Sequence, residues 1–252
     1  MKKVSVIVTT FNSQDVIGDC LESLSWADEV LVCDSYSSDK TLDIAREFAV
    51  SILQHEYESP AKQKNWVIPQ AKNEWILIID SDERVSPELK EEIESVLSRH
   101  QDFNSFKIPR LNISFGRKML HGGYWPDYQQ RLFKKDKARY ELVQVHEELL
   151  AEGPVGILKN PILHYPDRSI SQVIEKFFIR YAKWEAEKRL EKEKAGMLKI
   201  VISPFKIFIY RYFLLLGFLD GIRGFIAAFI WSVYIFLTYI YMWQMSLKES
   251  RE

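Results

Sequence analysis

The sequence lacks the residues that several common protein classes need. No glycine precedes Gly18, so the first turn carries neither the glycine-rich fingerprint of dinucleotide-binding proteins nor a phosphate-binding P-loop. Cys20 and Cys33 are the only cysteines and fall within an apparent helix and strand, which indicates neither a disulfide framework nor a zinc cluster and fits a reducing cytoplasm. The formal net charge of −1 argues against a broad nucleic-acid-binding surface, so we expect no nucleic-acid partner.

Length and composition limit the number of domains. With 252 residues and 47% hydrophobic content, the chain can bury one sizeable catalytic core and carry an appendage, but it cannot form two full domains. The apolar run at residues 4–8 is too short for a signal peptide and serves better as a first strand, so we do not expect secretion.

Strands and helices alternate along the first third of the chain. The pattern predicts a strand that starts at residue 4, strands at residues 30–33, 51–54 and 75–79, and helices at residues 13–25, 39–49 and 60–71. Strict alternation predicts an α/β fold with a mainly parallel sheet and helices on both faces. Ligands bind at the carboxyl ends of strands in such sheets, and each unusual polar cluster of this chain follows a predicted strand.

The most informative of these clusters follows the strand at residues 75–79. Large apolar residues, typical of a strand buried on both faces, end abruptly at Asp80-Ser81-Asp82. Asp80 and Asp82 point the same way in an extended chain, and converging carboxylates suit Mg²⁺ or Mn²⁺ that carries a phosphate. The alternative is a simple polar turn, with Ser86 capping the next helix and Pro87 at its first position.

These motifs, in this order and spacing, resemble family 2 glycosyltransferases of the GT-A fold. The upstream motifs are Thr9-Thr10-Phe11-Asn12, the Asp-Ser-x-Ser-x-Asp-x-Thr stretch of residues 34–41, Lys64-Asn65 and Asp80-Ser81-Asp82. Residues 122–133, 145–149 and 163–166 are further similar to the glycosyltransferases of the bacterial lipopolysaccharide core, a subgroup that includes a β-1,4-glucosyltransferase. The resemblance covers essentially the whole chain and implies the GT-A fold of nucleotide-diphospho-sugar transferases.

The resemblance also implies roles for the residues at the strand ends. It implies a nucleotide-sugar pocket lined by Thr9, Phe11, Asn12, Asp34, Lys64, Asp80 and Ser81. Asp82 would be the direct ligand of Mg²⁺ or Mn²⁺ with Asp80 beside it, although Glu83 follows and leaves open which carboxylate coordinates. Asn12 and Asp34 could instead close turns or cap helices, and Lys64 could be a solvated helix charge.

A sugar hydroxyl needs a base to become a good nucleophile. Asp127 is the first candidate, since it matches the acid of the family's Glu-Asp motif, although Pro126 replaces the glutamate. Glu147 is the second candidate and could instead position the acceptor or assist the metal. The expected acceptor-binding residues are Trp125, Arg131 and His146, with the alternatives that Arg131 belongs to a basic surface and His146 is an ordinary polar residue. One base and no covalent nucleophile predict inversion at the anomeric carbon.

The carboxyl-terminal part has a different character. A charged helical stretch at residues 185–194 is followed by apolar stretches at residues 204–219 and 224–247, which we interpret as a helical hairpin. Lys206 and Arg211 favour interfacial embedding of the first stretch, because each charge costs roughly 2.5–3.5 kcal/mol at mid-membrane. The second stretch carries no charge and is long enough to span ~30 Å of hydrocarbon or to dip in from one side. A buried helix pair at a homo-oligomer contact is the alternative.

Four segments follow: a nucleotide-sugar-binding part at residues 1–105, a catalytic and acceptor part at 106–167, a charged helix at 168–197 and a membrane-associated hairpin at 198–252. We expect a UDP-sugar donor and a lipid-linked saccharide acceptor, such as the growing lipopolysaccharide core, at the cytoplasmic face of the bacterial inner membrane. The competing hypotheses are a polyprenyl-phosphate glycosyltransferase, a sugar-phosphate nucleotidyltransferase and a membrane-bound saccharide-binding protein without turnover.

Overall fold

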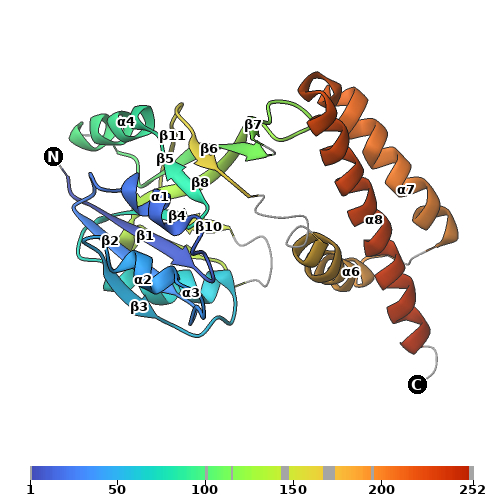
Figure 1. The fold of residues 1–252 in the computed structure, drawn as a ribbon, viewed down its shortest axis with the longest axis horizontal. Coiled ribbons are helices and arrows are strands. Elements are labelled where there is room, and N and C mark those ends of the chain that lie inside the picture. Colours follow the sequence, from blue (N-terminus) through green and yellow to red (C-terminus); the bar gives the residue numbers. More distant parts are fainter. Residues whose placement is uncertain are drawn as a thin grey trace. The chain divides into compact units, whose positions relative to one another are not determined.

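The computed structural model describes residues 2–99, 102–114, 116–142, 148–166, 174–193 and 196–249 (Figure 1). The chain divides into two compact units. The first comprises Met1–Leu111 and Asp127–His164, and the second comprises Asn112–Pro126 and Tyr165–Glu252.

The first unit begins with the predicted alternation of strands and helices. The parallel strands β1 (Val4–Thr10), β2 (Glu29–Asp34), β3 (Ser51–Gln54) and β4 (Trp75–Asp80) lie in the order β3-β2-β1-β4. The connecting helices are α1 (Ile17–Glu22), α2 (Thr41–Ala45) and α3 (Pro60–Val67), the last continued by a 3₁₀ turn at Ile68–Gln70. The prediction of a parallel sheet is therefore confirmed for these four strands.

Beyond β4 the strands β8 (Asp127–Lys134), β6 (Ser105–Ser114), β12 (Ile162–His164) and β5 (Glu83–Val85) follow in this order, and β7 (Arg117–Lys118) and β11 (Val155–Ile157) also pair with β6. The pairs β4–β8, β8–β6, β6–β7 and β12–β5 are antiparallel, whereas β11 pairs with β6 in parallel. The strands β9 (Ala138–Tyr140) and β10 (Leu149–Ala151) form a separate antiparallel pair. The complete sheet is mixed, because the later strands are not joined by the long helical crossovers that parallel neighbours require.

Both faces of the sheet are covered, as the alternation predicts. Val6, Val8 and Leu77 pack on one face against α1, α2 and α4 (Pro87–Ser98), whereas Ile7 and Ile78 pack on the opposite face against α3. Successive side chains of a strand point to opposite faces, so a continuous apolar run fills both cores. These cores hold the carboxyl ends of β1, β2 and β4 at one edge.

Capping side chains set the limits of several helices. The Ser86 hydroxyl accepts a hydrogen bond from the Leu89 amide at 3.2 Å and Pro87 occupies the first turn of α4, as the alternative interpretation of this turn predicted. The helix predicted at residues 13–25 is shorter in the structure. The Ser13 amide donates to the Thr41 hydroxyl at 2.6 Å, and this contact with the first residue of α2 holds the residues before Ile17 in a turn.

The second unit is mainly helical. Its elements are a π-helical segment at Ile174–Tyr181, α6 (Ala182–Leu190), α7 (Met197–Ile209), a π-helical turn η4 (Tyr210–Leu214), a 3₁₀ turn η5 (Gly217–Asp220) and α8 (Ile222–Glu249). The helices α7 and α8 pack on one another and form the expected hairpin, in which the Ser232 hydroxyl donates to the Pro204 carbonyl at 3.0 Å. The first helix of the hairpin begins at Met197, earlier than the apolar stretch alone suggested.

The turn of this hairpin depends on two glycines. A Cβ atom added at Gly224 would lie 1.8 Å from the Gly217 carbonyl oxygen, and one added at Gly217 would lie 2.7 Å from the Arg211 carbonyl oxygen. Backbone therefore touches backbone where η5 meets α8, and no side chain fits between them.

We expect Gly224→Ala to destabilise the second unit by about 1–3 kcal/mol, because overpacking against a backbone carbonyl forces the helices apart. Thermal unfolding of the full chain in detergent, followed by circular dichroism, measures the effect. Gly196→Ala is the matched control, since an added Cβ meets nothing within 4 Å there, and it should change stability by less than about 0.5 kcal/mol. Equal stability of the two variants would contradict the tight contact.

Candidate active site

The predicted polar clusters lie next to one another at the carboxyl edge of the parallel strands. In the register of the sheet Thr9 of β1 is opposite Asp80 of β4, and Thr10 is opposite Asp34 of β2. The Ser81 amide donates to the Thr9 carbonyl at 3.1 Å, and the Ser81 and Ser13 hydroxyls share a hydrogen bond of 2.8 Å. The structure thus brings together Thr9, Asp34, Asp80 and Ser81.

Asp80 is held as a charged carboxylate. Its Oδ1 accepts a hydrogen bond from the Thr9 hydroxyl at 2.8 Å, and its Oδ2 accepts one from Nη2 of Arg131 at 2.7 Å. Burial alone would raise the pKa of Asp80, but the charges of Arg131 and Lys64 and these hydrogen bonds hold that pKa well below its usual range. The side chain of Asp80 is 33% exposed, so part of this charge faces solvent.

Glu83 lies beneath Asp80 and is 0% exposed. Its Oε2 accepts the Asp80 amide at 2.9 Å, and its Oε1 lies 3.2 Å from Nη2 of Arg131 and 3.7 Å from Nη1 of Arg110. Burial raises the pKa of Glu83 above its ordinary value, against the lowering effect of Arg131. Glu83 is therefore part of the internal support of the site, whereas the side chains of Asp80 and Asp82 keep 33% and 17% of their surface exposed.

Arg131 comes from β8 and is only 5% exposed. Although burial lowers the pKa of an arginine, the charges of Asp80 and Glu83 raise the pKa of Arg131 well above its ordinary value. The structure places Arg131 against these two carboxylates rather than in an exposed basic surface. A contact between Arg131 and an acceptor remains a prediction.

His164 is a residue of this site to which the sequence analysis assigned no role. It ends β12, which pairs with β5 so that His164 is opposite Glu83. Its Nε2 lies 3.6 Å from Oδ2 of Asp82, and both side chains are mostly buried. The Leu-His-Tyr-Pro motif at residues 163–166 was the only sequence signal for it.

The described residues contain no group of three or more histidine, cysteine, aspartate or glutamate side chains that could hold a metal by itself. Asp82 and His164 offer one oxygen and one nitrogen side by side. Mg²⁺ is commonly bound through one or two carboxylates plus substrate phosphates and water. The donor set fits a divalent ion that binds together with a diphosphate rather than one held permanently by the protein.

The loops after β1 and β2 form the neighbouring part of the edge. Oδ1 of Asn12 accepts the Ser38 amide at 2.8 Å, and Asp34 is fully buried and accepts the Ser37 amide at 3.0 Å. Both side chains therefore close turns, and a nucleotide contact by either remains a prediction. Phe11 and Tyr36 project from these two loops and are 57% and 59% exposed, which leaves two aromatic faces at the edge.

Lys64 is not the solvated helix charge that the alternative interpretation described. It is buried in α3, its Nζ lies 4.9 Å from the centroid of the Tyr140 ring, and its charge contributes to the low pKa of Asp80. A buried lysine close to an acid-tipped strand suits an anionic ligand at this edge.

Asp127 starts β8 and is fixed by two neighbours. Its Oδ2 accepts hydrogen bonds from Nε of Arg110 at 2.9 Å and from Nη2 of Arg110 at 2.7 Å, and its Oδ1 accepts one from Nε2 of Gln129 at 2.7 Å. Arg110 also approaches Glu83 at 3.7 Å, so it links the predicted base to the carboxylates below Asp80. No sequence motif indicated this role of Arg110.

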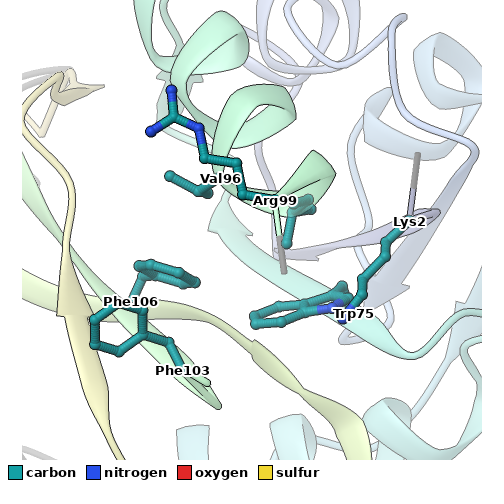
Figure 2. A pocket seen from close by; sticks show the side chains of 7 residues that line it. Lys2, Trp75, Val96, Arg99, Phe103 and Phe106 are labelled. Carbon is teal, nitrogen blue, oxygen red and sulfur yellow. The ribbon is translucent and has the colours of Figure 1, made fainter. Parts of the chain in front are cut away.

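Other predicted site residues lie elsewhere or outside the described part. Glu147 and His146 fall outside the described residues, and Trp125 belongs to the second unit. Figure 2 shows a pocket lined by Lys2, Trp75, Val96, Leu97, Arg99, Phe103 and Phe106. Trp75 begins β4 whereas Asp80 ends it, so this pocket lies at the opposite end of the strand from the acids.

The mixed sheet with carboxylates at the end of β4 has the layout of the GT-A fold. Residues 5–149 match the family described as "Glycosyl transferase family 2". The chain therefore belongs to glycosyltransferase family 2 and is a glycosyltransferase. The family resemblance and the GT-A fold that the sequence predicted are confirmed.

Curated relatives match along almost the whole chain. The lipopolysaccharide core biosynthesis glycosyltransferase LpsC of Rhizobium meliloti (strain 1021) is 27% identical over 261 residues, which cover 98% of this chain and 94% of the relative. The uncharacterized glycosyltransferase RP128 of Rickettsia prowazekii (strain Madrid E) is 26% identical and covers 99% of this chain and 89% of its own. The crystal structure of S. aureus TarS 1–349 in complex with UDP-GlcNAc has a TM-score of 0.51 at 19% identity, with 92% of this chain and 81% of that chain covered, and shows likeness of fold.

We expect Arg131→Gln to destabilise the protein by about 3–5 kcal/mol at neutral pH, because it leaves Asp80 and Glu83 without their buried partner. Since the pKa of Asp80 is lowered in the folded state, its stabilising contribution is present above the ordinary carboxyl pKa and is lost as the pH falls through the folded value. In the variant, protonation relieves the unpaired carboxylates, so the difference from wild type should shrink below about pH 4.

Urea unfolding at several pH values measures this difference. Arg46→Gln is the control, because the exposed Arg46–Asp43 pair should contribute no more than ~0.5 kcal/mol. A deficit for Arg131→Gln that stays constant with pH would contradict the buried charge network.

Proposed function

We propose that the protein is an inverting glycosyltransferase that moves a sugar from a UDP-sugar to a lipid-linked saccharide, such as the growing lipopolysaccharide core. The observation that carries the proposal is the arrangement of charged side chains at the carboxyl edge of the sheet in a family 2 chain. Asp80 is kept charged by Arg131, and Asp82 lies beside His164. The near full-length similarity to a lipopolysaccharide core biosynthesis glycosyltransferase supports the class of acceptor.

The carboxyl edge of β1, β2 and β4 is the donor site in this proposal. Thr9, Asp80 and the buried Lys64 lie where a diphosphate would bind, and the exposed faces of Phe11 and Tyr36 suit stacking on a base. Asp82 and His164 would hold a divalent ion, which supplies charge neutralisation as the sugar–phosphate bond breaks. The TarS structure that this fold resembles contains UDP-GlcNAc, which supports a uridine nucleotide.

Asp127 is the proposed base for the acceptor hydroxyl. A carboxylate has about four lone-pair positions, and the three hydrogen bonds from Arg110 and Gln129 take up all but one of them. The remaining position is available for the proton of the incoming hydroxyl. Arg110 is a positioning residue here, because it fixes the carboxylate without touching the reacting atoms. A single base at the acceptor implies direct displacement and inversion.

The second unit supports a membrane-bound acceptor. Its apolar side chains are widely exposed, among them Met197, Leu198, Phe205, Leu214, Leu219 and Phe229. In the described part of the chain one helix, Ile222–Leu247, is long and apolar enough to cross a bilayer by length and composition, with a mean hydropathy of 1.9. A soluble acceptor would give no reason for so much exposed apolar surface, and we assign this unit to the cytoplasmic face of the inner membrane.

Asp82→Asn should abolish the metal-dependent part of UDP binding, because it removes the carboxylate that would hold the ion. The measurement is the rise in thermal unfolding temperature on adding UDP with and without Mn²⁺, across a panel of UDP-sugars for the wild type. Asp43→Asn, which removes an exposed carboxylate that pairs with Arg46 and not with the site, should retain the full rise. Equal protection of all three proteins would remove the basis for the donor site.

Asp127→Asn should lower kcat by about 10²–10⁴-fold and leave UDP binding unchanged, because the amide cannot take the proton. Arg110→Gln should also lower kcat without affecting UDP binding, because the base loses the partner that fixes the orientation of its carboxylate. Transfer is measured with a radiolabelled UDP-sugar and two acceptors, a lipopolysaccharide-core lipid and a polyprenyl phosphate. Loss of UDP binding in Asp127→Asn would refute its role as base, and transfer to the polyprenyl phosphate alone would replace the proposed acceptor.

A further inference from the structure

Arg211 of η4 lies between two aromatic rings of the second unit. The centre of its guanidinium is 4.4 Å from the centroid of the Trp231 ring and 5.1 Å from that of the Tyr124 ring. Nε1 of Trp231 donates a hydrogen bond to the Tyr124 hydroxyl at 3.1 Å, which locks the two rings together. The rings therefore hold the guanidinium plane in a fixed position.

No carboxylate neutralises this charge among the described residues. The ion pairs of the second unit join Asp220 to His121, Glu175 to Arg180, Glu185 and Glu193 to Arg189, and Glu193 to Lys199. Arg211 takes part in none of them, and its buried Nε has no hydrogen-bond partner in the described part of the chain. A desolvated cation with an unsatisfied N–H is a site that an anion would complete.

The neighbouring acid, Asp220, is already occupied. Its Oδ2 accepts the amides of Leu120 and His121 at 3.1 and 2.9 Å, and its Oδ1 lies 2.8 Å from Nδ1 of His121. These contacts tie the loop that carries Tyr124 to η5. The loop and the helices thus form one frame around Arg211, and no ion pair joins Arg211 to a carboxylate of the residues that the structure describes in this frame.

A glycine leaves one edge of the guanidinium open. Gly123 is exposed, and a Cβ added there would lie 3.6 Å from Nη1 of Arg211 and 2.9 Å from Cδ1 of Leu215. Any larger residue would cover this edge. At this position the Nη1 side of the guanidinium fork therefore faces backbone rather than a side chain of residue 123.

The surroundings indicate which anion would reach this edge. Exposed apolar side chains flank Arg211 on both sides in sequence, namely Ile209, Tyr210, Phe213, Leu214, Leu216, Phe218 and Leu219. A basic side chain in such a surface sits at the level of the lipid headgroups, where the common anions are phosphates. The planar fork of arginine matches the geometry of a phosphate oxygen pair.

We propose that the Arg211–Tyr124–Trp231 cage binds a phosphate group of the lipid-linked acceptor at the membrane interface. This inference rests on the proposed lipid acceptor and assigns it a specific anchoring group. The lipid chains would lie along the exposed apolar side chains, and the phosphate would supply the counter-charge that the described ion pairs do not give to Arg211.

The test uses the full-length protein in neutral detergent micelles, with tryptophan fluorescence as the readout since Trp231 is part of the cage. Short-chain phosphatidic acid is the probe, and diacylglycerol of the same chain length is its uncharged match. We expect wild type to prefer phosphatidic acid by roughly tenfold, the scale of one charge-assisted contact. Arg211→Gln should lose this preference, whereas Lys206→Gln, which removes an exposed charge of the neighbouring α7, should keep it.

Each contrary outcome has its own meaning. Unchanged preference in Arg211→Gln, or equal loss in Lys206→Gln, overturns the cage and points to diffuse surface charge. Inorganic phosphate that binds as tightly as phosphatidic acid overturns the lipid source. If Arg211→Gln loses its helical circular dichroism, Arg211→Lys replaces it: this variant keeps the charge but loses the fork, so its preference should fall, and an unchanged preference overturns the proposal.

A parallel measurement separates this inference from the proposed function. The metal-dependent protection by UDP should be the same in Arg211→Gln and wild type, because Arg211 is not part of the donor site. Absence of that protection in wild type would defeat the proposed function whatever the lipid result. Normal protection without a preference for phosphatidic acid would defeat the cage alone.

Discussion

The buried contact of Arg131 with Asp80 and Glu83 is the constraint on which the site depends. It joins β8, β4 and β5, so three strands of the mixed sheet meet at one guanidinium. A carboxylate as deeply placed as Asp80 would tend to protonate, and the arginine keeps it ionised. Glu83 is fully buried between Arg131 and Asp80. Its pKa is raised, because burial and the negative charge of Asp80 outweigh the opposite effect of Arg131. The acid at the strand tip is therefore charged before any ligand arrives.

The sequence predicted the parts of the site that local pattern controls. A strand has a side-chain period of two and parallel neighbours end together, so the clusters after β1, β2 and β4 had to share an edge. The pairing of Thr9 with Asp80 and of Thr10 with Asp34 confirms this. The same reasoning could not find His164 or Arg110. His164 reaches Asp82 only because β12 pairs with β5. Arg110 lies opposite Asp127 in a β6–β8 register that a bulge at Phe106/Lys107 shifts.

The two units differ in how they bury apolar residues. The first fills two cores on either side of a sheet, and the family match at residues 5–149 falls mostly within it. The second packs large side chains such as Tyr234, Tyr239 and Met242 between helices while leaving other apolar side chains exposed. The alignment with the LpsC relative covers 98% of this chain, so it extends over the helical unit as well. The start of α1 depends on the hydrogen bond between Ser13 and Thr41, and the start of α8 on the close backbone approach of Gly224 to Gly217. Sequence patterns do not encode such contacts.

The hydrogen bonds around Asp127 also bear on which product can form. Arg110 holds one oxygen of the carboxylate and Gln129 the other, so these three hydrogen bonds leave about one of its four lone-pair positions. On the proposed mechanism a sugar ring offers several hydroxyls of nearly equal reactivity. Only the hydroxyl that approaches the remaining lone-pair position would lose its proton. Arg110 and Gln129 would therefore influence which hydroxyl forms the new linkage, although on this mechanism they act only through Asp127.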